Sequence, residues 1–125
     1  MASPRQQARP SPQQRAGRHR TRAQARIARE LAEIGFALPG SVSVRHYRCG
    51  KANCACHADS PRLHGPSIQW TRKINNKTVN RVLSEALWAD YRPWFEAARR
   101  LRALVAELEA LSLEIFEEDE RWNQR

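Results

Sequence analysis

The chain has 125 residues, with 22 Lys and Arg against 13 Asp and Glu, and a formal net charge of +9. This length allows one small domain with a limited core. No apolar run approaches the roughly 18 residues that a membrane span needs, and no apolar segment follows the first arginines as in a secretory signal. We therefore expect a cytoplasmic protein without a membrane partner.

The charge is divided along the chain. Residues 1–81 carry sixteen Lys and Arg against three acids, whereas residues 82–125 carry six against ten. A basic region of this size is typical of a protein that binds a polyanion, because Lys and Arg neutralise phosphates and release condensed counterions. The alternative is an ordinary soluble surface with an arginine-rich tail.

The N-terminal part combines an arm and a helix. Residues 1–29 contain eight arginines and no acid, so we expect residues 1–20 to form a disordered basic arm. From Thr21, Ile27, Leu31 and Ile34 recur at helical spacing. They predict a helix over residues 21–36, the first element of a single domain over residues 21–120.

Residues 41–83 have the alternation of short strands. Residues 41–49, "SVSVRHYRC", alternate between two faces and include β-branched and aromatic side chains. Residues 67–83 form two further runs that meet at Asn75 and Asn76, which tolerate the positive φ of a tight turn. We expect three short antiparallel strands, of which the last two form a hairpin.

The last third is helical. Ser84 is a suitable N-cap, and apolar residues then recur at steps of four and three. Pro93 favours a break, and the alternative is one long helix with a kink at this residue. Residues 84–120 are therefore predicted as a helical hairpin, a coiled-coil segment or a long kinked C-terminal helix, giving an α+β fold overall. The apolar seam either pairs with a second copy or another protein, or is covered by the first helix folding back antiparallel. The predicted interface residues are Leu87, Trp94, Leu101, Val105 and Leu108.

Between the first strand and the hairpin lie all three cysteines and two of the four histidines. Three Cys and one His form an ordinary ligand set for structural zinc, so we predict a zinc knuckle, with the metal ligands Cys49, Cys54, Cys56 and His64. His57 and His46 are alternatives for the fourth ligand. The cysteines could instead be buried small side chains.

A catalytic cysteine is a third interpretation of this segment. A nucleophilic thiol needs a base and an orienting group beside it. Histidines are close in sequence, but carboxylates and a glycine-rich oxyanion element are not. We therefore expect no catalytic residue and no enzyme activity.

Several segments together resemble a known family. "RCGKANCAC", "HGP", "RKINNKTV" and "RPWFEAARRLRALVAELEALSLEI" resemble a small bacterial family of unknown function that is often encoded beside transposase and other mobile-element genes. The resemblance covers roughly residues 22–116, with Ser67 where the family usually carries an aromatic residue. It implies a setting in DNA handling, with a transposase or recombinase as a possible protein partner. The family pattern maps onto Cys49, Gly50, Lys51, Asn53, Cys54, Cys56, His64, Gly65, Pro66, Lys77 and Thr78.

Two functions fit these patterns. The first is a zinc-stabilised module that binds nucleic acid, with DNA favoured over RNA, and in which Asn75, Asn76 and Asn80 could reach base edges. The second is a coiled-coil adaptor that binds a protein or a second copy, with zinc only structural. For the first function the predicted contacts are Arg45, Arg48, Lys51, Arg72, Lys73, Lys77 and Arg81.

Overall fold

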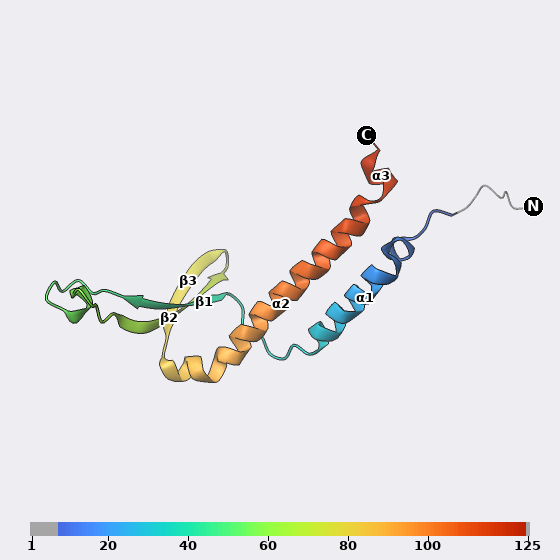
Figure 1. The fold of residues 1–125 in the computed structure, drawn as a ribbon. Helices are drawn as coiled ribbons and strands as arrows, with labels where there is room; N and C mark the ends of the chain where they lie inside the picture. The colour runs from blue at the N-terminus through green and yellow to red at the C-terminus, as the bar shows by residue number, and fades with distance from the viewer. Residues whose placement is uncertain (1–7, 125) are drawn as a thin grey trace, which may run out of the picture. The chain divides into compact units, whose positions relative to one another are not determined.

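The computed structural model describes residues 8–124 and has the predicted α+β arrangement, with an N-terminal helix, three antiparallel strands and a long C-terminal helix (Figure 1). Residues 1–7, part of the expected basic arm, lie outside the described residues. The elements are α1 (Pro12–Ala32), β1 (Ser41–Tyr47), the short 3₁₀ helix η1 (Ala55–His57), β2 (His64–Ile74), β3 (Lys77–Leu83), α2 (Glu85–Glu117) and α3 (Glu120–Asn123).

The contacts divide the chain into two compact units. The helical unit comprises Met1–Ile34 and Arg100–Arg125, and the sheet unit comprises Gly35–Arg99. Helix α2 runs through both, so each part of α2 is described with its own unit.

The sheet has the order β1-β2-β3, with both pairs antiparallel. Because side chains alternate along a strand, the register defines two faces. The face with Ile68 packs against α2: Ile68 is 2% exposed, and the Trp70 ring meets that of Phe95 at 5.6 Å. The opposite face, here the open face, consists of Ser41, Ser43, Arg45, Ser67, Gln69, Thr71, Lys73, Thr78, Asn80 and Val82.

The predicted hairpin is confirmed. Asn75 and Asn76 have φ values of 51° and 66°, and Ile74 pairs with Lys77 on either side of them. These positive values at both central residues are those of the tight turn that matches the twist of two strands. The turn chemistry of asparagine therefore fixes the β2–β3 register.

In the helical unit, α1 lies antiparallel to the C-terminal part of α2. Arg15 pairs with Asp119 at 2.8 Å, Arg20 with Glu118 at 2.5 Å, and Arg26 with Glu107. As the residue numbers of the arginines rise along α1, the residue numbers of their acidic partners fall, which is the order expected for antiparallel segments. Ile27 and Leu104 are the buried apolar residues of this unit. The arrangement matches the intramolecular alternative for the apolar seam.

Helix α1 ends at Ala32 instead of residue 36. Two larger differences from the sequence-based expectation remain, and the first is the start of α1. The helix begins at Pro12, so residues 12–20 are helical instead of disordered. Ser11 caps it, with a bond from the Gln14 backbone to its hydroxyl and a return bond from its own backbone to the Gln14 side chain. At Gly17 (φ 73°) the helix is kinked. Acids far along the chain offset the arginine repulsion that argued against a helix here.

The second difference concerns Pro93. The expected break is absent, and the alternative of one long C-terminal helix is confirmed, because α2 continues through this residue for 33 residues in all. A proline inside a helix removes one hydrogen bond and tends to kink the helix, and Figure 1 shows α2 bending towards its N-terminal end. Phe95 and Ala98, both buried, anchor the helix after Pro93, and the Trp88 ring meets that of Phe95 at 5.7 Å across the lost bond.

A candidate metal centre and the open face of the sheet

The four predicted metal ligands come together. Each of Cys49, Cys54, Cys56 and His64 offers one ligand atom, and these atoms all lie within 4.8 Å of one another. The Sγ atoms of Cys49 and Cys56 are 3.7 Å apart, and Cys54 Sγ lies 3.2 Å from His64 Nε2. This cluster can bind a metal ion.

The local fold explains how residues up to fifteen positions apart converge. Cys49 follows the end of β1, Cys54 and Cys56 flank the start of η1, and His64 is the first residue of β2. His64 pairs with Tyr47 across β1 and β2, and their rings stack at 5.6 Å. The two strands therefore bring the ends of the loop together, and η1 turns its cysteines back towards them.

The glycine after His64 is required by the close approach of the two strands. Gly65 has a φ of 117°, and a Cβ atom at this position would lie 2.7 Å from the carbonyl oxygen of Arg45. Residues other than glycine rarely adopt this backbone conformation. Gly65 thus allows β2 to start beside β1 with His64 directed at the cysteines.

The cysteines differ in their surroundings. Hydrogen bonds from the Cys56 backbone and from His64 lower the pKa of Cys54 to about 6, so Cys54 is largely a thiolate at neutral pH. Burial raises the pKa of Cys56, although the backbone N–H of Cys49 donates to its sulfur at 3.3 Å. Cys54 can therefore act as an anionic ligand before a metal binds. The buried Cys56 thiol would lose its proton when a cation binds beside it.

Of the three candidates for the fourth ligand, the structure brings His64 to the cysteines. The Nε2 atom of His57 lies 2.6 Å from the carbonyl oxygen of Cys49 instead. His46 lies on β1 and is exposed. His57 was one of the alternative ligands expected from the sequence, and its contact with the Cys49 carbonyl was not predicted. Its position next to Cys56 in the chain, which would strain a chelate, is the sequence signal against it as a ligand.

The distances fit a tetrahedral ion. Metal–sulfur bonds of about 2.3 Å in a tetrahedron place two sulfurs about 3.8 Å apart, close to the 3.7 Å between Cys49 and Cys56. Three sulfurs and one imidazole nitrogen form a donor set that soft or borderline cations prefer to Mg²⁺ or Ca²⁺. The residues present therefore fit a bound transition-metal ion.

The predicted nucleic-acid contacts do not form one surface. By register, Arg45 and Lys73 lie on the open face, whereas Lys77 and Arg81 lie on the face that includes Trp70. Arg72 shares that second face, and its guanidinium stacks on the Trp70 ring at 4.4 Å. The remaining two, Arg48 and Lys51, are exposed near the cysteine loop.

The open face carries Asn80, which the sequence analysis named as a possible base contact, together with Gln69 and Thr71, which it did not name. The Asn80 amide donates to Gln69 at 3.2 Å, and the Thr71 hydroxyl donates to Asn80 at 3.5 Å. Alternate positions of each strand carry Ser, Thr, Asn or Gln, a signal that is visible in the sequence once the register is known. No acid is present among the residues of this face.

The predicted interface residues are likewise divided between the two units. Leu87 lines an apolar hollow of about 190 Å³ in the sheet unit, and Trp94 packs against Phe36 at 4.9 Å. In the helical unit, Leu101 and Leu108 are half-buried and Val105 is exposed.

Residues 16–92 match the family described as domain of unknown function DUF6788. The chain belongs to this family. The match includes the whole metal cluster, all three strands and the first turns of α2, and it ends before Pro93. No curated protein and no solved structure matches the chain. None of the helices between residues 8 and 124 has the length and apolar character required to cross a membrane.

Proposed function

We propose that this protein is a zinc-stabilised module that binds nucleic acid, with DNA as its target, and that its role is binding and not catalysis. An accessory role in a mobile element, suggested by the family resemblance, belongs to the same proposal. The observation that carries the proposal is the open face of the sheet, which is polar, basic and free of acids.

Zinc is the metal that the cluster suits best. Three cysteines and one histidine in a closed tetrahedral arrangement form a structural zinc site, whereas catalytic zinc keeps one position open for water. The ion would join the ends of β1 and β2 through Cys49 and His64. Its role would be to hold the sheet in the conformation that presents the open face.

The charge around the sheet supports a polyanionic partner. Residues 41–83 contain eight Lys and Arg and a single acid, Asp59. Lys and Arg side chains at this density would bind phosphates, and the release of condensed counterions would favour binding. Arg45 and Lys73 would contact the backbone, because they are the charged residues of the open face.

Uncharged side chains on the same face supply hydrogen-bonding groups. Asn80 and Gln69 are held by their mutual bond, with Thr71 beside them. Amide groups can bond to phosphate oxygens or to base edges, and Asn and Gln suit adenine in the major groove. Side chains held in place lose less conformational freedom on binding.

The test compares two double variants with equal loss of charge. Arg45→Gln with Lys73→Gln removes the cations of the open face, and Lys77→Gln with Arg81→Gln removes two from the other face. Duplex DNA affinity is measured by fluorescence anisotropy from 50 to 300 mM salt. We expect the open-face variant to reduce the slope of log affinity against log salt by about 1.8, because each phosphate contact contributes about 0.9.

The control variant should change this slope by much less. Equal effects of the two variants would show that only net charge matters and would remove the open face from the proposal. Binding that does not depend on salt, or the absence of binding to the metal-loaded protein, would contradict the proposed function itself.

The adaptor function remains the second candidate, favoured by apolar side chains exposed on α2. Leu87 is 47% exposed beside the apolar hollow, and Val105 is 41% exposed. If these residues bind a second copy, sedimentation analysis will show a mass that rises with concentration and falls to the monomer in Leu87→Asp and Val105→Glu. A monomer at all concentrations would contradict self-association.

A further inference from the structure

Two groups of arginines in α1 differ in their partners, and Arg26, which pairs with Glu30 and Glu107, belongs to neither. Arg15 and Arg20 pair with Asp119 and Glu118, the acidic residues between α2 and α3. A second group, Arg18, Arg22 and Arg29, is exposed and has no acidic partner within residues 8–124. Since an α-helix has 3.6 residues per turn, this second group lies along one side of α1.

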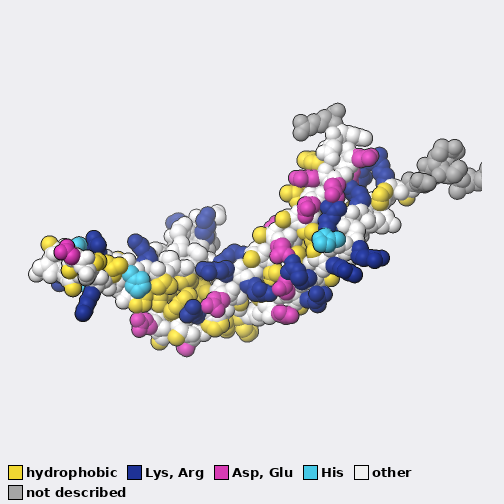
Figure 2. Space-filling model, in the orientation of Figure 1, with side chains coloured by type: hydrophobic (Ala, Val, Ile, Leu, Met, Phe, Trp, Pro, Cys, Tyr) yellow, Lys and Arg dark blue, Asp and Glu magenta, His cyan; other side chains and the backbone are white. Residues whose placement is uncertain are grey.

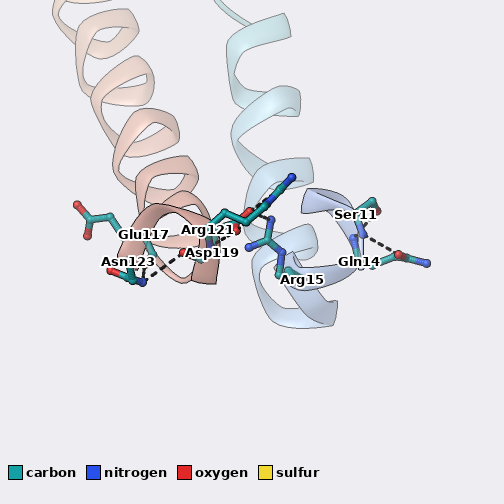
Figure 3. Close-up of polar contacts among 7 residues, drawn as sticks. All are labelled: Ser11, Gln14, Arg15, Glu117, Asp119, Arg121 and Asn123. Atoms are coloured by element: carbon teal, nitrogen blue, oxygen red, sulfur yellow. Dashed lines mark hydrogen bonds and ion pairs between the residues drawn. The ribbon is translucent and has the colours of Figure 1, made fainter. Parts of the chain in front are cut away.

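The two carboxylates contact their arginines in the way that a bound phosphate would. Arg15 donates to Asp119 Oδ2 at 2.8 Å, and Arg121 donates to both oxygens of the same carboxylate (Figure 3). Glu118 accepts two bonds from Arg20, at 2.9 and 2.5 Å. Bidentate contacts of this type are the ones that arginine makes to phosphate.

These carboxylates are ionised near neutral pH. Hydrogen bonds from Arg121 lower the pKa of Asp119 well below its usual range, and the bond from Arg20 lowers that of Glu118. Figure 2 shows basic and acidic side chains interleaved over the two helices of this unit. The ion pairs are partly exposed, and such pairs are weak and screened by salt. A polyanion that offers many phosphates can therefore displace them.

We propose that the acidic turn of Glu118 and Asp119 is a built-in competitor of nucleic acid for α1. The phosphate backbone would first bind Arg18, Arg22 and Arg29. It would then take Arg15 and Arg20 as the acidic turn is displaced. This inference rests on the proposed function but concerns a separate surface, so it can fail on its own.

The test frees Arg15 and Arg20, together with Arg121, without adding cations. Glu118→Gln with Asp119→Asn removes both carboxylates, and asparagine retains the capping role of residue 119. Glu109→Gln with Glu117→Gln is the matched control: it removes the same charge from α2, but neither carboxylate pairs with an arginine within residues 8–124. In Figure 3 the Glu117 carboxylate points away from Arg15.

For duplex DNA, the salt slope of the first variant should be steeper than that of wild type by about 1.8. In wild type the carboxylates freed from Arg15 and Arg20 take up cations, which offsets the counterions released by those two phosphate contacts, and the variant lacks this offset. Extrapolated from 1 M, this difference in slope corresponds to about 60-fold tighter binding at 0.1 M salt. The control should keep the wild-type slope. Equal slopes in the two variants would overturn the competition while leaving the proposed function intact.

Hydrogen exchange on the wild-type protein gives a readout that does not depend on a variant folding. The amides of Glu118, Asp119, Trp122 and Asn123 donate to backbone carbonyls. If the turn is displaced, adding duplex DNA will speed exchange at these amides. Unchanged or slower exchange at saturating DNA would overturn the inference, and a failure of every variant to bind DNA would overturn the proposed function along with it.

Discussion

The choice of the fourth ligand is decided at the level of single residues. His64 lies 3.2 Å from Cys54 Sγ, whereas His57 contacts the carbonyl of Cys49. We expect His64→Ala to lose the metal and His64→Cys to retain it, because four thiolates also form a zinc site. His57→Ala should keep one metal per chain. Elemental analysis of the purified variants gives the ratio, and loss of metal in His57→Ala alone would assign the ligand to His57.

Gly65 provides a second prediction at this scale. Its φ of 117° and the nearby Arg45 carbonyl leave no room for a methyl group. We expect Gly65→Ala to lower the free energy of unfolding by about 1–3 kcal/mol and to weaken metal binding by moving His64. Gly50 is the control, because no atom lies within 4 Å of a Cβ at this position. Equal thermal and metal-binding profiles for the two variants would contradict this role of Gly65.

The sequence was most informative where the chemistry is local. Cys49, Cys54 and Cys56 are close in the chain, so a short loop is enough to bring them together. The choice of His64 over His57 depends on the β1–β2 register, in which Tyr47 faces His64. Nothing in the cysteine segment itself encodes that pairing, which is why three candidates remained open before the structure was known.

At the level of elements, predictions succeeded where the signal was complete within one segment. Asn75 and Asn76 specify their turn by themselves. The start of α1 was missed, although Ser11 and Gln14 form a recognisable capping pair, because the arginine-rich composition dominated the interpretation. The acids that pair with this segment lie about one hundred residues away, and a local pattern cannot show them.

The ion pairs of the helical unit predict a dependence on pH. The folded state lowers the pKa of both Glu118 and Asp119, so the unfolded chain binds more protons in acid. The stability that these pairs contribute is therefore complete above the usual carboxyl pKa of about 4 and is lost as the pH falls towards the folded values. Thermal melts followed by circular dichroism should show a helical transition that is constant from pH 7 to about pH 5 and falls below about pH 4.

Glu118→Gln with Asp119→Asn provides the comparison for that measurement. This variant lacks the two titrating carboxylates, and its midpoint should fall less steeply in acid than the wild-type midpoint. Identical acid profiles would place the sensitivity in other carboxylates, such as Glu30 and Glu107, which also pair with arginines.

At the scale of the whole molecule, the division into two units follows from how α2 is used. Its first part packs on the sheet through Phe95, and its later part is joined to α1 by the ion pairs of Glu107 with Arg26 and of Arg100 with Glu30. A continuous apolar repeat predicted the long seam, but it did not show that two different partners share it. In the sheet unit the loop between β1 and β2 carries the candidate metal ligands, whereas the helical unit has its own ion pairs and buried apolar residues.

Removing the metal should therefore affect the two units unequally. In the sheet unit the buried apolar residues are only Cys56, Ile68, Phe95 and Ala98, and in small domains a structural metal supplies much of the folding free energy. We expect a strong chelator to abolish amide protection in β1 and β2, while amides of α1 and of α2 beyond residue 100 remain protected. Hydrogen exchange with and without chelator measures both units in one experiment. Cys56→Ser should reproduce the loss without chelator, and simultaneous loss of protection in both units would show that they fold as one cooperative domain.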